Sequence, residues 1–169
     1  LRVDPDKVVA VVATHAPDRY LAASVFLLGA NDETFASVSS RDGEIHRVLY
    51  HHFSYEDHGD AVAIQVTGMG DWTISLEPVS TAVPWTDADQ PLEGQSSEVY
   101  SVGWDVSGED LAMEHNGESN FAIWAMDLTS GSYDLLANEI GPYEETVTLP
   151  SGTTLLDVTA DGEWSLSVS

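Results

Sequence analysis

Residues 66–76 read Val66-Thr-Gly-Met-Gly-Asp-Trp-Thr-Ile-Ser-Leu76, and residues 158–168 read Val158-Thr-Ala-Asp-Gly-Glu-Trp-Ser-Leu-Ser-Val168. The two stretches lie 92 positions apart, and five of their eleven positions are identical. In each copy a glycine-containing turn leads into a segment in which Trp and aliphatic residues alternate with Thr and Ser. This period of two is typical of a strand with one buried face. Each copy therefore predicts a strand, a tight turn and a closing strand.

A weaker similarity pairs Ser24–Leu28 with Asn120–Trp124. Together the two similarities indicate two related β-rich halves, residues 1–80 and 93–169. Residues 81–92 contain two prolines and several turn formers, so we expect a linker there. The halves are compatible with two domains or with one fused sandwich.

The predicted strands are short and are separated by regular turn signals. In the first half they are Val8–His15, Leu21–Gly29, Glu44–Phe53, Ala61–Thr67 and Trp72–Leu76; in the second they are Val99–Val106, Leu111–Glu114, Phe121–Leu128, Glu144–Leu149, Thr154–Thr159 and Trp164–Val168. This pattern predicts an all-β fold, an antiparallel β-sandwich of a jelly-roll-like or immunoglobulin-like kind. We expect no substantial helix.

The charge distribution is one-sided. The formal net charge is −24, and no Lys or Arg follows Arg47, whereas 22 Asp and Glu residues do. Such a surface repels itself in dilute buffer, but at molar salt the screening length falls to about 3 Å. The acids are scattered, and 43% of the residues are hydrophobic, which disfavours a disordered acidic tail. We therefore expect a halophilic, haloarchaeal protein.

Composition also bears on partners. Nucleic acid is not an expected partner, because phosphate binding needs clustered cations. The sequence has no apolar run of about 18 residues, so no membrane-spanning helix is expected. The 169 residues contain no cysteine, which excludes disulfides, thiolate metal sites and a cysteine nucleophile.

The second half resembles a module of secreted and cell-surface proteins of bacteria and archaea. The resemblance rests on Asn116–Asp127, on Asp134–Tyr143 and on Leu156–Leu166, which share a Gly-rich turn before Asn-Phe, an Asn-Glu-Ile-Gly turn and a closing Asp-Gly-x-Trp hairpin. It implies a β-sandwich located outside the cell or on its surface, and it carries no catalytic residues. The first half keeps only the closing hairpin, with Met69-Gly70 in place of Asp161-Gly162.

One histidine-rich segment contains ligand types that zinc, copper or nickel prefer. Its candidate metal ligands are His51, His52, His58 and Asp60. His51 and His52 would point to opposite faces of a strand, so only one of them could join His58. The alternative is a solvated hairpin end, and we expect no cofactor.

Paired carboxylates occur at Asp87/Asp89, Glu109/Asp110 and Glu144/Glu145. With 29 acids in the chain, such pairs arise by chance, and no calcium-loop pattern accompanies them. No Gly-x-Ser-x-Gly elbow is present either. The sequence therefore favours a protein that is not an enzyme.

The five tryptophans raise the possibility of a sugar-stacking platform. Trp72 and Trp164 occupy equivalent hairpin positions, and Trp104 and Trp124 lie in apolar strand patterns, so these four favour core packing. Trp85 lies in the predicted linker, where it either fills the seam between the halves or is exposed as a ligand-binding residue.

One apolar run lacks the alternation of polar and apolar residues, so both of its faces must be buried. It comprises Val8, Val9, Ala10, Val11 and Val12. A central strand meets this need. Donation of the strand to a neighbouring subunit would also meet it, as in extracellular filaments. The favoured interpretation is the intramolecular one.

These observations predict a non-catalytic extracellular or cell-surface module with a structural, adhesive or filament-forming role. Its partners would be further copies of itself or other cell-surface proteins. The alternative is a module that binds a glycan or another small ligand.

Overall fold

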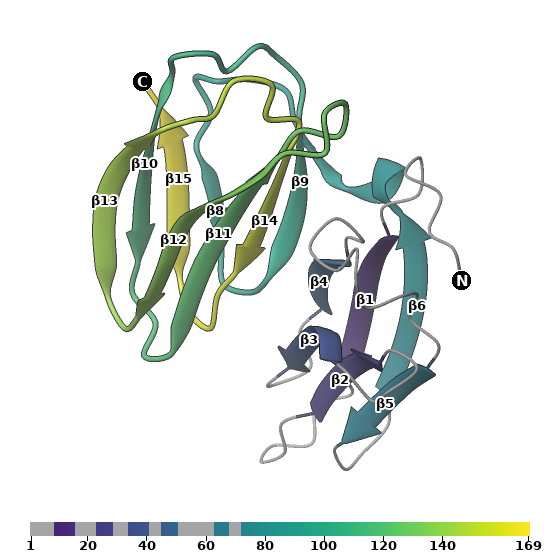
Figure 1. Cartoon of the computed structure of the whole chain (residues 1–169). Helices are drawn as coiled ribbons and strands as arrows, with labels where there is room; N and C mark the ends of the chain where they lie inside the picture. The colour runs from purple at the N-terminus through teal and green to yellow at the C-terminus, as the bar shows by residue number, and fades with distance from the viewer. Residues whose placement is uncertain (1–8, 16–22, 29–33, 41–44, 51–62, 68–71) are drawn as a thin grey trace. The chain divides into compact units, whose positions relative to one another are not determined.

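The computed structural model divides the chain into two compact units, Leu1–Thr81 and Ala82–Ser169 (Figure 1). It describes residues 9–15, 23–28, 34–40, 45–50, 63–67 and 72–169. The second unit is described without gaps, and we treat each unit by itself.

The second unit is a sandwich of two β-sheets (Figure 1). Its strands are β7 (Val83–Trp85), β8 (Leu92–Gly94), β9 (Glu98–Val102), β10 (Asp110–His115), β11 (Asn120–Met126), β12 (Tyr133–Ile140), β13 (Tyr143–Thr148), β14 (Leu155–Thr159) and β15 (Trp164–Val168). The five-stranded sheet has the order β12-β11-β14-β9-β7, and the four-stranded sheet has the order β13-β10-β15-β8. Its neighbouring strands are antiparallel except for β7, which runs parallel to β9.

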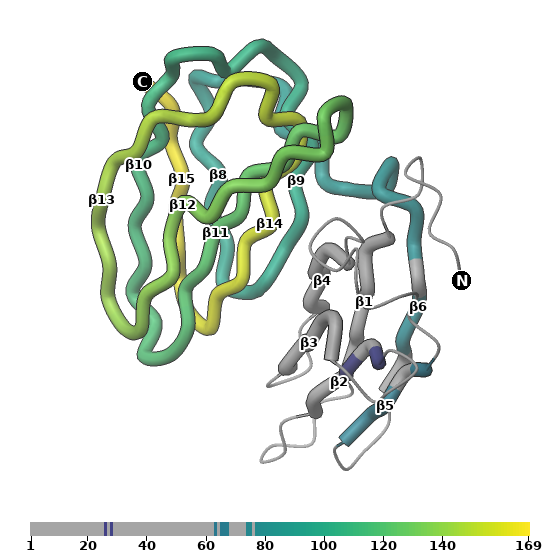
Figure 2. The backbone as a smooth tube through the Cα atoms, in the orientation of Figure 1, coloured from purple at the N-terminus to yellow at the C-terminus, as the bar shows by residue number. Residues whose placement is uncertain are grey.

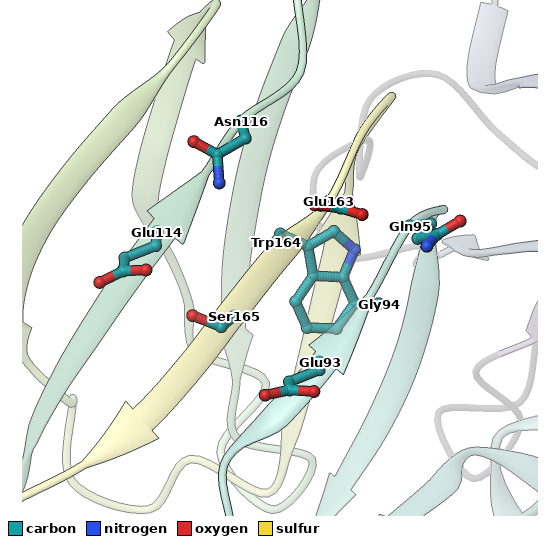
Figure 3. A pocket seen from close by; sticks show the side chains of 8 residues that line it. All are labelled: Glu93, Gly94, Gln95, Glu114, Asn116, Glu163, Trp164 and Ser165. Atoms are coloured by element: carbon teal, nitrogen blue, oxygen red, sulfur yellow. The ribbon is translucent and has the colours of Figure 1, made fainter.

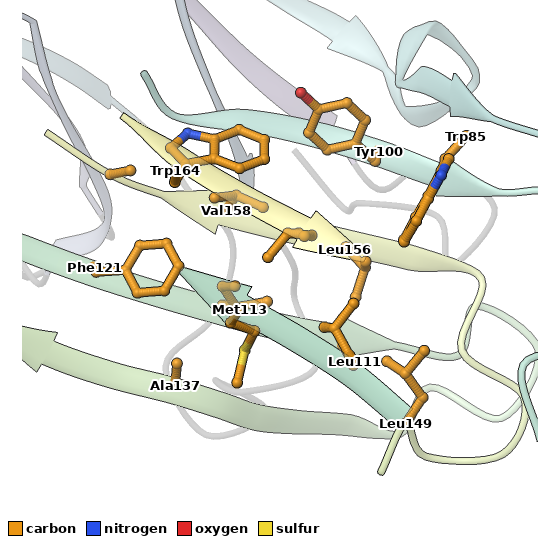
Figure 4. Close-up of a cluster of buried hydrophobic side chains, with 14 of the residues drawn as sticks. Trp85, Tyr100, Leu111, Met113, Phe121, Ala137, Leu149, Leu156, Val158 and Trp164 are labelled. Atoms are coloured by element: carbon orange, nitrogen blue, oxygen red, sulfur yellow. The ribbon is translucent and has the colours of Figure 1, made fainter. Parts of the chain in front are cut away.

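Alternation of side chains along the strands explains why the two sheets pack. On β10, Leu111 and Met113 are buried whereas Glu114 is exposed, and on β15 Trp164 and Leu166 are buried. These side chains meet those of the opposite sheet in one hydrophobic core (Figure 4). Burial of each large apolar side chain stabilises the fold by about 1.5–3 kcal/mol, before the loss of conformational entropy is subtracted. The alternation read from the sequence is therefore the main determinant of this core.

The described residues of the first unit form two three-stranded sheets. Its strands are β1 (Val9–His15), β2 (Ala23–Leu28), β3 (Thr34–Ser40), β4 (Ile45–Tyr50), β5 (Ala63–Thr67) and β6 (Trp72–Pro78), and a 3-10 turn, η2 (Val79–Thr81), follows them. The sheet orders are β4-β1-β6 and β3-β2-β5. All of these strand pairs are antiparallel.

The two units share one pairing plan. Strands β1 to β6 pair with one another as β10 to β15 do, because β4-β1-β6 matches β13-β10-β15 and β3-β2-β5 matches β12-β11-β14. The register agrees as well: His15 lies opposite Trp72, and His115 lies opposite Trp164. The two repeated segments thus occupy equivalent places in a pairing pattern that both units share. In each, the two strands belong to different sheets, so the closing hairpin expected from the sequence is wrong and the turn passes from one sheet to the other.

The predicted all-β sandwich class is confirmed, but sequence analysis missed four strands: the short strands β7 and β8, and the longer strands β3 and β12. The two longer ones share a cause. They occupy equivalent places, each at the edge of its sheet. Each also pairs across an irregularity, at Leu27/Leu28 for β3 and at Ile123/Trp124 for β12. Such a shift breaks the period of two, and both strands contain residues with low strand preference. The alternation of apolar and polar residues is therefore lost in β3 and in β12 for the same reason.

The expected linker at 81–92 is wrong. Ala82 is the first residue of the second unit, β7 is the edge strand of its five-stranded sheet, and β8 begins at Leu92. Pro84 fits this arrangement, because a proline is tolerated on an edge strand.

Strand β1 is a central strand, which supports the intramolecular interpretation of the valine run. Residues 9–14 pair with β4 on one side and with β6 on the other. Both hydrogen-bonding edges of Val9, Val11 and Val12 are therefore used within the chain, so donation of this run to a neighbour is contradicted. Val8 lies outside the described residues.

Three connections that cross from one sheet of the second unit to the other turn at the same end of the sandwich (Figure 2). They join β10 to β11, β12 to β13 and β14 to β15, and we call residues 116–119, 141–142 and 160–163 the turn cluster. Backbone hydrogen bonds connect the three turns: the Asn116 amide donates to the Glu163 carbonyl, and the Gly141 amide donates to the Ser119 carbonyl.

A glycine-to-alanine substitution tests the packing of the four-stranded sheet. A Cβ at Gly94 would lie 2.4 Å from Cζ2 of Trp164, whose indole is fixed by a hydrogen bond to the Ser96 carbonyl. We expect Gly94→Ala to destabilise the protein by about 1–3 kcal/mol through overpacking. Urea unfolding in concentrated salt measures this loss.

The matched control is Gly103→Ala. The nearest atom to its Cβ would be the Trp85 carbonyl oxygen at 3.4 Å, which is an ordinary contact. Equal stability of the two variants would contradict the described packing of Trp164.

Candidate functional site

The described residues form one notable concavity, on the four-stranded sheet (Figure 3). Its volume is about 490 Å³, and its lining combines three carboxylates, two amides, a hydroxyl, a glycine and an indole. The lining residues are Glu93, Gly94, Gln95, Glu114, Asn116, Glu163, Trp164 and Ser165.

The strand register places these groups. Glu114 lies opposite Ser165 on one side and opposite Glu144 on the other, and Ser165 lies opposite Glu93. The exposed side chains of four adjacent strands therefore form one row, Glu144, Glu114, Ser165 and Glu93, across the outer face of the sheet. We call these four residues the acidic row.

The electrostatics of the acidic row are unfavourable in dilute buffer. Glu114 and Glu144 are direct cross-strand neighbours of like charge, an arrangement that destabilises a sheet. Residues 82–169 include no Lys or Arg that could compensate. The concavity is thus an anionic surface whose oxygen atoms can accept hydrogen bonds.

The site does not bring Ser165 together with the histidine of the second unit. Ser165 faces outward, whereas His115 is buried on the inner face of the same sheet. Successive residues of a strand point to opposite faces, so the two groups are separated by the sheet itself. No group of three or more His, Asp or Glu side chains within the described parts of the chain could hold a metal ion.

Other carboxylates accept hydrogen bonds within their own loops. Hydrogen bonds from the Ser107 side chain and then its amide lower the pKa of Asp105, and those from the Ser130 hydroxyl and the Thr129 amide lower the pKa of Asp127. Of the paired acids predicted from sequence, Asp87 accepts a hydrogen bond from the Asp89 amide at 3.1 Å. These hydrogen bonds indicate that Asp87, Asp105 and Asp127 stabilise turns.

Trp85 is not exposed, and its place is within the second unit. It is 2% exposed and belongs to the core of the second unit, where it contacts Trp104 edge-to-face with ring centroids 4.9 Å apart. Its Nε1 donates a hydrogen bond to the Gln90 carbonyl at 2.8 Å. Its burial contradicts a sugar-stacking role. Sequence analysis missed this because proline-rich flanks masked the short strand β7.

Trp164 packs in the core as expected, edge-to-face with Tyr100. Trp124 differs, because it is only half-buried and stacks in parallel on Tyr133 at a centroid distance of 4.1 Å.

The histidine-rich metal candidates stay a prediction. His51, His52, His58 and Asp60 all lie outside the described residues.

No known protein-family model matches the chain, and no curated protein is detectably similar to it. Within the described residues, no helix has the length and apolarity that crossing a membrane requires.

The phenol of Tyr143, at the start of β13, gives a pH-dependent test. Burial, the hydrogen bond to Glu145 and the charge of Glu145 raise the pKa of Tyr143 to about 12 from its ordinary value of 10.0. The raised pKa contributes stability that is present below pH 10 and is lost as pH rises from 10 to about 12. Ultraviolet titration should show one late-titrating phenol that Tyr143→Phe removes.

Glu145→Gln should lower the pKa of Tyr143, whereas Glu109→Gln serves as a control of equal charge change. If the phenol that Tyr143→Phe removes titrates at the ordinary value instead, the described contact between Tyr143 and Glu145 is contradicted.

Proposed function

We propose that this protein is a non-catalytic structural or adhesive module of the cell surface or extracellular space of a halophile. The acidic row carries the proposal, because opposed carboxylates without cations are tolerable only where salt screens them. The shared pairing plan of the two units adds support, since repeated sandwich units are common building blocks of surface proteins.

The described surface also supports a non-enzymatic role. The Ser165 hydroxyl in the concavity has no histidine beside it, because His115 is buried on the inner face of the sheet, and the core beneath is filled with hydrophobic side chains. A sandwich with a filled core is suited to hold parts of a surface protein apart or to contact another protein.

Self-association stays part of the proposal, with the edge strands β12 and β13 as its route. Each is the last strand of its sheet, and each has exposed acids that discourage edge pairing in dilute buffer, such as Asp134, Glu139 and Glu144. At molar salt this protection weakens, which would allow contact between copies.

Salt dependence tests the proposal. At about 0.1 M salt, where the screening length is about 10 Å, Glu114→Gln should stabilise the protein by about 0.2–1 kcal/mol by removing the repulsion with Glu144. At about 1 M or above this gain should vanish. Urea unfolding of both proteins across a salt series measures the difference.

Asp134→Asn is the matched control, because it removes one exposed charge whose cross-strand neighbour is Ala125. The wild-type protein should also gain stability with salt. A wild-type protein that is equally stable in dilute buffer and in brine would refute the halophilic setting.

A glycan-binding module is the second candidate, and the concavity favours it. Carboxylates, amides and a hydroxyl around the edge of an indole are groups that bind sugar hydroxyls. This site replaces the one expected at Trp85.

A panel of soluble oligosaccharides tests the second candidate. A binder should shift the amide resonances of Glu93 and Ser165, and Glu93→Ala should weaken binding at least tenfold, which is about 1.4 kcal/mol. Asp134→Asn should bind as the wild type does. A panel that leaves every resonance in place would rule out this function for the concavity.

A further inference from the structure

His115 is the only side chain of the second unit that can carry a positive charge. Residues 82–169 contain seventeen Asp and Glu residues, no Lys, no Arg and this single histidine. A solubilising histidine would lie at the surface, but His115 is 1% exposed, at the end of β10 on the inner face. Its burial requires a specific partner for each ring nitrogen.

One ring nitrogen is satisfied by a turn. Nδ1 lies 2.9 Å from the Gly141 carbonyl oxygen, and the ring stacks on Phe121 with centroids 4.6 Å apart and planes 7° apart. A carbonyl only accepts hydrogen bonds, so Nδ1 must hold a proton. In a neutral imidazole, Nε2 would then hold only a lone pair.

The other ring nitrogen faces a carboxylate. Nε2 is buried without a hydrogen bond to any described group, and Oδ1 of Asp161 lies 3.3 Å away. A lone pair on Nε2 would face the negative oxygen, which is repulsive in a buried site. A proton on Nε2 reverses the sign of this interaction. The imidazolium is therefore the form of the ring that suits both neighbours.

Two glycines allow Asp161 to approach the ring of His115. A Cβ at Gly117 would lie 2.4 Å from Nε2 of His115 and 2.3 Å from Oδ1 of Asp161, and a Cβ at Gly162 would lie 2.5 Å from the Gly117 Cα. Side chains at these positions would separate the turns. Through its two nitrogens and Gly117, His115 contacts all three turns of the turn cluster.

We propose that the buried ring of His115 is held as an imidazolium against the partly exposed carboxylate of Asp161, and that this proton acts as a pH-sensitive latch on the turn cluster. The latch is closed while both groups are charged. It opens when either charge is lost, because the attraction between Nε2–H and the Asp161 carboxylate is then lost. Because the His115 ring is buried and the Asp161 side chain is 23% exposed, salt screens this pair less than a pair with both partners at the surface.

The other titratable groups near the latch do not reproduce this response. Tyr143 of β13 lies opposite His115, and its pKa of about 12 keeps it neutral over the range in which histidine titrates. Glu114 of β10 points to the opposite face, and Glu139 of β12 and Glu163 of the β14–β15 turn are exposed. Among the described residues, Asp161 is the carboxylate whose oxygen lies within ion-pair distance of the ring, at 3.3 Å from Nε2.

The first unit offers a natural contrast. His15 occupies the register position of His115, opposite Trp72. By the sequence repeat, Met69 stands where Asp161 does. The position that holds the carboxylate in the second unit is thus a methionine in the first. This inference stands apart from the proposed cell-surface role.

A double-mutant cycle with His115→Gln and Asp161→Asn tests the latch in the full chain. Urea unfolding in concentrated salt, followed by tryptophan fluorescence, gives the folding equilibrium constants. We expect about tenfold coupling between the two substitutions at mildly acidic pH and none at alkaline pH. The control pair, His15→Gln with Asp161→Asn, should show no coupling at any pH. Coupling of the main pair that is independent of pH would overturn the proposal.

Nitrogen NMR of the wild-type imidazole keeps the proposal testable if the variants fail to fold. The His115 ring is identified by through-space contacts to the Phe121 ring, and both ring nitrogens should be protonated at neutral pH. A spectrum with an unprotonated Nε2 at mildly acidic and neutral pH would refute the latch.

Discussion

The fold depends on burying an apolar interior beneath a surface of almost one charge sign. In the second unit the interior is continuous, from Trp85 and Tyr100 at one edge to Leu111, Phe121 and Leu166 between the sheets. Burial of these side chains opposes the repulsion of the acids outside. Because hydrophobic packing has no charge for salt to screen, it works in any ionic strength, whereas the repulsion depends on the solvent. Salt therefore sets how far this balance favours the native state.

Much of this architecture could be predicted from local sequence, because the burial of one strand face produces both the alternation of apolar residues and the packing of the sheets. The alternation around Trp72 and Trp164 reports which face is buried, and the strands predicted there are present. The signal fails for β3 and β12, where an irregular register breaks the alternation. It also fails for β7, because three residues are too few to display a period.

The candidate sites were less predictable, because they depend on contacts between residues far apart in the sequence. Trp85 was singled out for its unusual surroundings, yet it is core. His115 was overlooked within an apolar strand, although its uniqueness among residues 82–169 and the glycines at 117 and 162 are visible in the sequence. Only the pairing of β10 with β13 and β15 brings these features together. The acidic row likewise needs the register of four strands.

The parallel pairing of β7 with β9 has a mechanical consequence. Only four residues, 79–82, separate the last strand of the first unit from β7, so a pull transmitted along the chain reaches Val83–Trp85 before any other part of the second unit. The backbone bonds to β9 and the anchored indole of Trp85 bear that load first. Detachment of β7 leaves β12, β11, β14 and β9 still paired. The entry strand can thus yield under tension and extend the chain while most of the sandwich stays intact.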